Sequence, residues 1–397
     1  MPVNMMFPDD NHKQFMAAHR DDDINSLLLH ASRYPDIDVP FAVQQMEGRR
    51  KATLKFPSLL HFDDFVFPPQ INMEQASSEI TARYKSSLVA RQEVIDLTGG
   101  LGIDSFFMSQ EARHLLYLER NEALFALAQH NFQILGVSIE TLCNDGLAFL
   151  QNTQRQADYL YVDPSRRDHN HQRVVSLEKY EPNVLTALPL FFQHAPHVLI
   201  KASPMLDISL TLRALQHVAK VHVVAVKNEC KELLFDCVDE DCETEIVTVH
   251  FGLQGEERFA FSALEEQQAK ATYSNTAKKY LYEPNVALLK AGAFRILSER
   301  FGVDKLHPAS HLYTSDQWVS HFPGRIFEVI TTFPLHKEAI IQWIPTRKVN
   351  ITVRNFPLSV VEIRRKFRLE DGGDDYLFAT TLADDSKRMI LCKKKVR

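Results

Sequence analysis

A glycine-rich turn that joins an apolar run to a helical pattern is the feature that most constrains the fold of this chain. Residues 96–104 read DLTGGLGID and directly follow the apolar pair Val94-Ile95. Because glycines remove side chains from the place where a ligand must sit, the backbone of such a strand–turn–helix unit can approach a nucleotide-like molecule closely. The turn therefore predicts a binding site for a nucleotide-like cofactor at the carboxyl end of a strand.

Length and composition predict several domains in a reducing compartment. The chain has 397 residues, of which 45% are apolar, enough for two or three domains with their own cores. Its five cysteines form no CxxC pair and no zinc-ligand spacing, which predicts no metal site. The N-terminus is polar and unlike a signal peptide, and no apolar run approaches the roughly 20 residues of a membrane span. We therefore expect a cytoplasmic protein with no membrane partner.

Changes of pattern along the chain predict four regions. Residues 1–90 are mostly helical, residues 91–255 alternate strands with helices, residues 256–320 hold a linker and a small insert, and residues 321–397 form a compact module. Gln254–Lys279 is expected to be a polar linker of helical tendency. In the insert that follows, Pro284–Phe301 is expected to be one amphipathic helix.

The second region has seven expected strands. They are Val94–Leu97, Leu115–Leu118, Ser138–Leu142, Tyr159–Val162, Val198–Lys201, Val221–Val226 and Glu245–Phe251. Short apolar strands separated by helices imply an α/β fold with a mostly parallel sheet buried on both faces. The last two strands, joined by a helix-breaking acidic stretch rich in cysteine, could pair antiparallel.

The C-terminal module follows the order β-α-β-α-β-β and is basic. From His321 to Arg397 it has 15 Lys and Arg against 9 Asp and Glu, a net charge of +6, so the remainder carries −12. Arg364, Arg365 and Lys366 lie on or beside a helix of this module, in a mixture of basic and aromatic residues that suits an RNA backbone. A solvated basic helix face explains the same pattern equally well.

The glycine turn departs from the dinucleotide fingerprint G-x-G-x-x-G, because Ser105 stands at its last position. It fits better the D-x-G-x-G-x-G loop of class I S-adenosylmethionine (SAM) methyltransferases, in which Asp96 would help to hold the cationic amino-acid end of SAM. Thr98 replaces the first glycine of that loop. The residues assigned to the cofactor are Asp96, Thr98, Gly99, Gly100 and Gly102. A turn that serves only strand–helix packing is the alternative.

Two further carboxylates follow at strand ends. Glu119 lies 23 residues after Asp96, where it can accept hydrogen bonds from ribose hydroxyls, and Arg120 beside it is included in the cofactor site. Asp145 follows the third strand and could accept from the adenine amino group, and Gly146 would start the next helix. A solvated Glu119 and a helix N-cap at Asp145 are the structural alternatives.

The turn after the fourth strand carries the predicted reaction site. Asp163-Pro164-Ser165 resembles the (D/N)-P-P-x motif of amino-directed nucleic-acid methyltransferases, in which the carboxylate and a backbone carbonyl accept from the target amine. Ser165 replaces the second proline, and Arg166 replaces the usual aromatic residue. Arg166 and Arg167 could therefore bind phosphate, with a salt bridge as the alternative.

Two residues at later strand ends are weaker candidates. Lys201 closes the fifth expected strand, where it could approach a substrate phosphate or extend along the sheet end to solvent. Cys230 lies in an acidic run that would raise the pKa of its thiol, which disfavours a nucleophilic role.

Together these strings resemble the bacterial class I SAM-dependent methyltransferases with a C-terminal THUMP-like domain, a family seen in Bacteroidetes. Besides the Asp96 loop, the resemblance rests on residues 74–79 (EQASSE), 163–167 (DPSRR), 201–204 (KASP) and 229–232 (ECKE), and it extends over nearly the whole chain. It implies a Rossmann-like seven-stranded sheet, a ferredoxin-like insert around residues 280–315 and a THUMP-like module from about Phe322. THUMP domains generally deliver RNA, often tRNA, so the resemblance also implies an RNA methyltransferase.

The sequence therefore predicts a SAM-dependent methyltransferase that modifies RNA (tRNA or rRNA) at a base amine. Its catalytic residues would be Asp163, Pro164 and Ser165. The substrate contacts would come from Arg166, Arg167, Lys201, Arg364, Arg365 and Lys366. A protein or small-molecule methyltransferase and a non-catalytic RNA-binding protein with a vestigial SAM site are the alternatives, and the missing third glycine disfavours a nicotinamide-dependent oxidoreductase.

Overall fold

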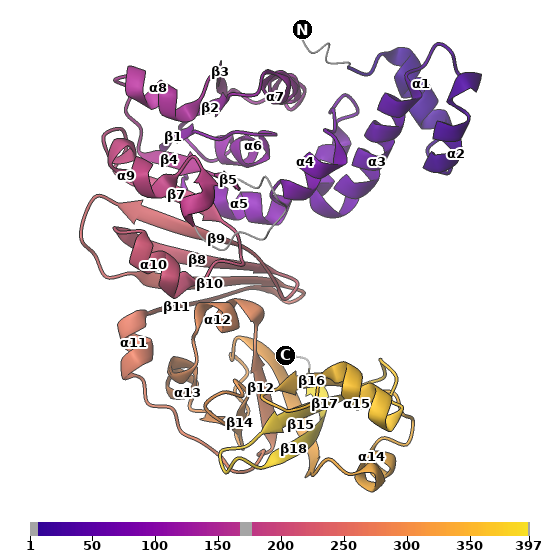
Figure 1. Ribbon diagram of the computed structural model, residues 1–397, viewed down its shortest axis with the longest axis vertical. Helices are drawn as coiled ribbons and strands as arrows, with labels where there is room; N and C mark the ends of the chain where they lie inside the picture. The colour runs from indigo at the N-terminus through magenta and orange to yellow at the C-terminus, as the bar shows by residue number, and fades with distance from the viewer. Residues whose placement is uncertain (1–6, 167–176, 396–397) are drawn as a thin grey trace. The chain divides into compact units, whose positions relative to one another are not determined.

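The computed structural model describes residues 7–166 and 177–395, in two compact units (Figure 1). The first unit comprises Met1–Ala219 and Leu234–Cys242, and the second comprises Lys220–Leu233 and Glu243–Arg397. None of the described helices combines the length and the apolar character that a membrane span requires.

Helices with side-chain caps open the first unit. Asp9, Asp23, Asp38 and Ser78 each accept a hydrogen bond from the backbone N–H three residues later, and such a cap contributes about 1 kcal/mol. The elements of this segment are α1 (Asp10–Ala18), α2 (Ile24–Leu29), the 3₁₀ turn η1 (Ala31–Arg33), α3 (Val39–Lys55), the 3₁₀ turn η2 (Pro57–His61), α4 (Gln70–Gln75) and α5 (Glu79–Leu88).

A nine-stranded sheet follows, in the order β11-β10-β8-β9-β7-β4-β1-β2-β3. Its strands are β1 (Glu93–Asp96), β2 (His114–Glu119), β3 (Glu140–Cys143), β4 (Tyr159–Val162), β7 (His197–Ala202), β8 (Val218–Val226), β9 (Glu229–Val238), β10 (Glu245–Gly252) and β11 (Gly255–Ser262). The pairs β1–β2, β2–β3, β1–β4 and β4–β7 are parallel, so the carboxyl ends of these strands share one edge. The expected α/β fold is confirmed.

Helices cover both faces of the parallel part of the sheet. The helices α5, α6 (Ile103–Ser109) and α7 (Glu122–Ile134) lie on one face. The helices α8 (Gly146–Asn152), α9 (Val184–Phe192) and α10 (Ile208–Ala214) lie on the other (Figure 1). A short pair, β5 (Ser165–Arg166) and β6 (Tyr180–Glu181), with the 3₁₀ turn η3 (Leu177–Lys179), follows the end of β4. Burial on both faces explains why the central strands read as continuous apolar runs.

The sheet has two strands more than the seven expected. The acidic, cysteine-rich stretch is strand β9, which follows β8 through a two-residue turn at Lys227 and Asn228, both with left-handed φ angles of 50° and 61°. Because the chain reverses once into β9 and again into β10, β10 runs parallel to β8, and the antiparallel pairing expected there is wrong.

Residues 254–279 are also not a helical linker throughout. Gly255–Ser262 forms β11, antiparallel to β10, before the short helix α11 (Ala263–Gln268). Phe259 and Phe261 are buried and alternate with the more exposed Arg258, Ala260 and Ser262, a period-2 pattern that is characteristic of a strand with one buried face.

The second sheet lies wholly in the second unit, in the order β13-β14-β12-β15-β18-β17-β16. Its strands are β12 (Tyr280–Pro284), β13 (Asp304–Lys305), β14 (Tyr313–Ser315), β15 (Gly324–Phe333), β16 (Asn350–Arg354), β17 (Asp375–Thr381) and β18 (Lys387–Lys395). The single helix expected over residues 284–301 is two helices, α12 (Val286–Ala291) and α13 (Arg295–Phe301), because Gly292 ends the first with a φ angle of 79°.

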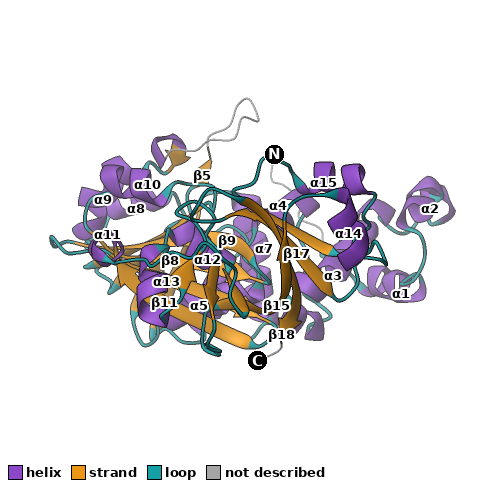
Figure 2. Cartoon of the chain, turned by 90° about the horizontal axis from the view of Figure 1, so that it is seen from below, coloured by secondary structure: helices purple, strands orange, loops and turns teal. Residues whose placement is uncertain are grey.

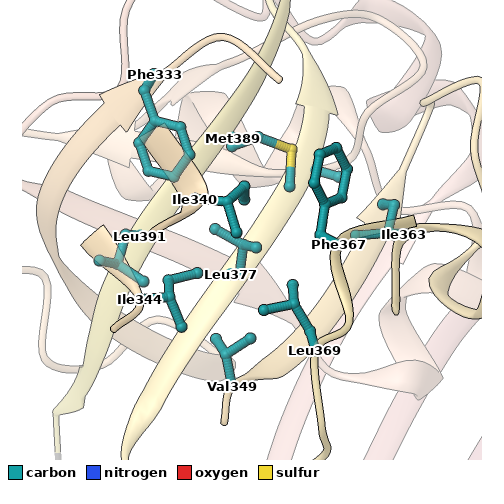
Figure 3. Packing of buried hydrophobic residues seen from close by; sticks show 11 residues of the cluster. Phe333, Ile340, Ile344, Val349, Ile363, Phe367, Leu369, Leu377, Met389 and Leu391 are labelled. Atoms are coloured by element: carbon teal, nitrogen blue, oxygen red, sulfur yellow. The ribbon is translucent and has the colours of Figure 1, made fainter. Parts of the chain in front are cut away.

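Two helices, α14 (Lys337–Trp343) and α15 (Val360–Phe367), pack beside β15, β17 and β18 (Figure 2). The expected order β-α-β-α-β-β over residues 324–395 is therefore correct. Figure 3 shows the core between the helices and strands, in which Ile340 and Ile363 from the helices meet Leu377, Met389 and Leu391 from the strands. Full burial of each such side chain contributes about 1.5–3 kcal/mol, so this cluster supports the module.

Candidate cofactor and substrate site

The glycine turn between β1 and α6 is shaped largely by the packing of the protein itself. A Cβ atom at Gly99 would lie 2.0 Å from Cε2 of the buried Tyr117, and one at Gly102 would lie 2.5 Å from Cζ of Phe132. Gly100 has a left-handed φ angle of 55°, and a Cβ atom there would meet its nearest neighbour, a backbone oxygen, only at 3.8 Å. A ligand can therefore approach the backbone at Gly100.

Asp96, at the end of β1, holds this turn from inside. Its side chain accepts hydrogen bonds from the N–H of Thr98 at 3.0 Å and from the hydroxyl of Ser105 at 2.5 Å, and the residue is only 1% exposed. Burial raises the pKa of the Asp96 carboxyl to about 7, although both hydrogen bonds lower it. The carboxyl thus stabilises the turn, and its contact with a cofactor stays a prediction.

Glu119, at the end of β2, accepts a hydrogen bond from the same glycine turn. Its two carboxylate oxygens accept hydrogen bonds from the N–H of Gly100 at 2.8 Å and from the N–H of Asn121 at 2.7 Å. The hydroxyl of Tyr117 donates to the carbonyl of Gly100 at 2.6 Å. An ionised carboxylate has about four acceptor positions, so Glu119 keeps acceptor capacity for a ligand beside Gly100.

Asp145 caps the helix that follows β3. One carboxylate oxygen accepts from the first-turn N–H groups of α8, at 3.0 and 3.1 Å, and the other lies 3.6 Å from Nη1 of Arg120. The same Arg120 nitrogen donates to Glu181 at 3.0 Å. Gly146 is required because a Cβ atom there would lie 2.5 Å from the carbonyl oxygen of Leu97. The expected N-cap role of Asp145 is thus present, and Arg120 links it to the segment after the Asp163 turn.

The Asp163 turn is tied directly to the glycine turn. The backbone N–H of Asp163 donates to the hydroxyl of Thr98 at 2.7 Å. The next residue, Pro164, is buried, and the hydroxyl of Ser165 donates to the carbonyl of Glu181 at 3.3 Å. Thr98 therefore uses its hydroxyl in the position where the related loops have glycine.

The two arginines assigned to a substrate phosphate fall at the edge of the described chain. The backbone of Arg166 pairs with Tyr180 in the β5–β6 hairpin. The side chain of Arg166 and all of Arg167 lie outside the described residues.

Lys201, at the carboxyl end of β7, lies between two carboxylates. Its Nζ atom is 2.6 Å from Oδ2 of Asp163 and 3.6 Å from Oδ2 of Asp104, and its side chain is 11% exposed. Asp104, in the first turn of α6, also accepts hydrogen bonds from the hydroxyls of Tyr161 at 2.7 Å and Ser77 at 2.8 Å. The contact of Lys201 with a substrate phosphate stays a prediction.

Sequence reasoning missed the part that the N-terminal helices play in this site. Nζ of Lys85, on α5, lies 3.3 Å from Oδ1 of Asp104, and the Lys85 side chain has no exposed surface. The nearby Lys85 and Lys201 ammonium groups lower the pKa of Asp104 to about 2, against the effect of its burial. The sequence signal that could have found this ion pair was Asp104 itself, a carboxylate in a helix in which Ile103 and residues 105–108 are buried.

The basic residues of the C-terminal module lie on α15 and face different surroundings. Arg364 forms an ion pair with Asp371, Arg365 is exposed, and Nζ of Lys366 lies 5.6 Å from the ring centre of Phe367. Because Arg364 is already paired, Arg365 and Lys366 are the cations of this group that remain open to an external anion.

Cys230 is a poor nucleophile mainly because its thiol is buried, and only secondarily because of its acidic neighbours. Burial is the main cause that raises the pKa of its thiol to about 11, and Glu232 and Glu229 add to the effect. Within the described ranges, no group of three or more His, Cys, Asp and Glu side chains could hold a metal ion.

Two sequence families match the C-terminal part of the chain. Residues 280–323 match a ferredoxin-like domain, and residues 324–394 match a THUMP domain-like family. No curated protein matches the chain.

Solved structures resemble the chain to very different extents. A candidate methyltransferase from Porphyromonas gingivalis W83 is 32% identical, with a TM-score of 0.86, and the match covers 98% of this chain and 100% of that protein. A candidate RNA methyltransferase from Pyrococcus horikoshii is 15% identical over 34% of this chain and 66% of that one, with a TM-score of 0.26. A candidate methyltransferase from Streptococcus mutans in complex with SAH is 12% identical over 40% of this chain and 97% of that one, with a TM-score of 0.29.

The similarity to the P. gingivalis protein extends over both chains almost in full, and it includes the helical N-terminal segment as well as the two C-terminal domains. The expected resemblance is therefore confirmed. The chain belongs to the family of that protein, the bacterial class I methyltransferase-fold proteins that carry a C-terminal THUMP-like domain.

Proposed function

We propose that this protein is a SAM-dependent methyltransferase that modifies an RNA at an amino group of a base. The observation that carries the proposal is the state of Asp163 at the carboxyl end of β4. Its backbone is bound to Thr98 and one carboxylate oxygen is bound to Lys201, whereas its Oδ1 makes no hydrogen bond with any described residue. An acceptor fixed in this way can orient an amine at the sheet edge where ligands of α/β folds bind.

The residues around the glycine turn fit SAM. At Gly100 a side-chain atom would meet no protein atom closer than 3.8 Å, and Glu119 has acceptor capacity next to it for ribose hydroxyls. Asp96, Thr98, Gly99, Gly102, Arg120, Asp145 and Gly146 would complete the cofactor site. When bound, SAM supplies a methyl group on a sulfonium, which is already a good leaving group.

The protein's own residues would then act mainly by positioning. Asp163 accepts an N–H of the target amine at Oδ1, which directs the nitrogen lone pair away from the carboxylate and fixes the approach of the nucleophile. Pro164 is buried and restricts the backbone of the turn. The hydroxyl of Ser165 donates a hydrogen bond to the carbonyl of Glu181, which holds the turn against that segment. Alignment of this kind supplies much of the acceleration when the leaving group is good.

The RNA part of the proposal is supported by the THUMP-like domain and by the basic residues of α15. Arg365→Ala combined with Lys366→Ala should weaken binding to total cellular RNA and should reduce the slope of log K against log salt concentration by about 1.4–1.8, because each of the two phosphate contacts contributes about 0.7–0.9. Arg113→Ala, an exposed arginine on the first unit that is paired with Glu93, is the matched control and should leave the slope unchanged. Equal salt-dependence slopes in the wild-type protein, the double variant and Arg113→Ala would contradict RNA binding through α15.

Nucleoside mass spectrometry of total RNA from a deletion strain tests the reaction. We expect one methylated nucleoside to disappear, to return with the wild-type gene, and not to return with Asp163→Ala. Calorimetry should give the Asp163→Ala variant nearly wild-type affinity for SAM, since Asp163 acts on the amine, whereas Glu119→Ala should bind SAM weakly. An unchanged nucleoside profile would favour a protein or small-molecule substrate, and a wild-type protein that does not bind millimolar SAM would contradict the enzyme proposal altogether.

A further inference from the structure

Lys201 is held in one place by charges on both sides. Its ammonium group lies 2.6 Å from one oxygen of Asp163 and 3.6 Å from Asp104. Asp104 is itself fixed by Tyr161, by Ser77 and by the buried Lys85. A lysine side chain is usually mobile, but one that is 11% exposed and paired with both Asp163 and the anchored Asp104 has little freedom to turn away.

This arrangement leaves Asp163 with one occupied and one open oxygen. Oδ2 accepts from Lys201, and Oδ1 has no hydrogen-bond partner within residues 7–166 and 177–395. The Asp163 side chain is 37% exposed, so the open oxygen can be reached from solvent. Asp163 can therefore accept one hydrogen from an incoming group without losing its bond to Lys201.

The charged side chains of this cluster also balance. Asp104 and Asp163 bring two negative charges, and Lys85 and Lys201 bring two positive charges. The neighbouring Asp96 has a pKa raised to about 7 by burial, so it adds only a partial charge near neutral pH. The cluster thus offers an acceptor oxygen with only a small net negative charge to attract a cation.

Amines that could be methylated differ in charge. An alkylamine such as a lysine side chain is cationic at neutral pH, with a pKa of about 10.4, and must lose a proton before its nitrogen can attack. An exocyclic amine of a nucleobase is already neutral and carries hydrogens for a carboxylate oxygen. Next to the fixed ammonium of Lys201, a second cation is repelled, whereas a neutral amine is not.

We propose that Lys201 is a positioning and specificity residue that fixes Asp163 and restricts its open oxygen to neutral aromatic amines, against alkylammonium groups. The inference rests on the proposed methyl transfer, and it names the class of acceptor that the same site takes. On transfer the nitrogen forms a bond to the methyl carbon, the carbon–sulfur bond breaks with its electron pair on sulfur, and the proton released by the nitrogen passes through Oδ1 of Asp163 to water.

The test compares Lys201→Met, Lys201→Gln and Lys201→Arg with the wild-type protein. The substrates are total RNA from a strain that lacks the gene and poly-L-lysine, and each protein is also measured for SAM affinity by calorimetry and for its melting temperature. Lys51→Met is the matched control, because Lys51 is a lysine with a 40% exposed side chain that lies 4.0 Å from Glu74, in a loose surface ion pair.

We expect the wild-type protein to methylate RNA and not poly-L-lysine. Lys201→Met and Lys201→Gln should lower kcat on RNA about tenfold or more and raise the share of transfer that goes to poly-L-lysine, with SAM affinity within about twofold of wild type. Lys201→Arg should recover most of kcat, and Lys51→Met should behave as wild type. If Lys201→Met fails to fold, the Gln and Arg pair gives the same comparison.

Wild-type kcat in Lys201→Gln, or a wild-type protein that methylates poly-L-lysine as readily as RNA, would overturn the inference. The first result leaves the proposed RNA methylation intact. A wild-type protein that binds SAM but modifies neither substrate contradicts the proposed function, and this inference with it. A parallel loss of SAM affinity, melting temperature and kcat in Lys201→Gln and Lys201→Arg alike would assign Lys201 a structural role only.

Discussion

The hydroxyl of Thr98 accepts a hydrogen bond of 2.7 Å from the backbone N–H of Asp163, and so joins the glycine turn to the turn that carries the proposed acceptor carboxylate. The two residues follow different strands, β1 and β4, which pair in parallel, so their turns start from the same sheet edge. A glycine at position 98 could not make this bond. The departure of Thr98 from the usual loop is thus a link between the cofactor side and the substrate side of the site.

Replacement of Thr98 should uncouple these two turns. Thr98→Val keeps the shape of the side chain but removes the acceptor, and loss of one such bond costs about 1 kcal/mol, which urea denaturation can measure. Methyl transfer should fall by about tenfold, because Asp163 loses its backbone anchor. Thr98→Ser keeps the hydroxyl and should stay close to wild type. If the Thr98→Val and Thr98→Ser variants have the same stability and the same rate of methyl transfer, this hydrogen bond does not contribute to function.

Substitutions of two adjacent glycines should separate packing from ligand access. Gly99→Ala places a methyl group 2.0 Å from the buried ring of Tyr117 and should cost about 1–3 kcal/mol of stability. Gly100→Ala makes only an ordinary contact, 3.8 Å from the carbonyl oxygen of Thr98, so it should cost only about 1 kcal/mol for its positive φ angle and should weaken SAM binding. Gly136→Ala is the control, because Gly136 has a similar φ angle of 65° with no neighbour within 4 Å. Equal SAM affinity in the Gly100 and Gly136 variants would argue against a ligand at Gly100.

Asp96 should make the stability of the protein fall as pH rises toward neutrality. Burial raises the pKa of its carboxyl from 3.8 to about 7 in the folded chain. A group with a raised folded-state pKa stabilises the fold fully below its unfolded pKa, and this contribution is lost as pH rises through the folded value. Between pH 4 and 7 the free energy of unfolding should therefore decrease by up to about 1.4 kcal/mol per pH unit from this group. Urea titrations of Asp96→Asn should lack this component, and identical pH slopes in the two proteins would contradict it.

Lys85 should be essential for stability although it belongs to the N-terminal helices. Lys85→Met leaves the Asp104 carboxylate in a largely buried site without one of its two cations, a change that costs about 3–5 kcal/mol. The double variant Lys85→Met with Asp104→Asn removes the unpaired charge and should recover part of that loss. Lys51→Met, on the exposed pair with Glu74, should change the free energy of unfolding by less than about 1 kcal/mol. A Lys85→Met protein as stable as the Lys51→Met protein would show that Asp104 does not depend on Lys85.

The sequence alone determined the parts of this protein that depend on local pattern. Apolar runs that end in Asp96, Glu119 and Asp163 marked strands whose carboxyl ends share one edge, and the three glycines marked the turn that follows the first of them. The period of the C-terminal segment likewise gave its β-α-β-α-β-β order. Each of these features is recorded within a few neighbouring residues, because strand and helix periods repeat over two to four positions.

Only the tertiary structure decided which distant groups meet and which strands pair. The strand β9 was not predicted, because its acidic residues mask the apolar pattern of a hairpin strand. The direction of β10 depends on the chain reversal that leads into β9. Likewise, Lys85, Asp104, Asp163 and Lys201 come from a helix before the sheet and from three later segments, and no local pattern brings them together. Their burial and mutual charge set the pKa of Asp104 and leave Oδ1 of Asp163 without a hydrogen bond to any residue that the structure describes. The desolvation and ion pairing behind these properties exist only once the chain has folded.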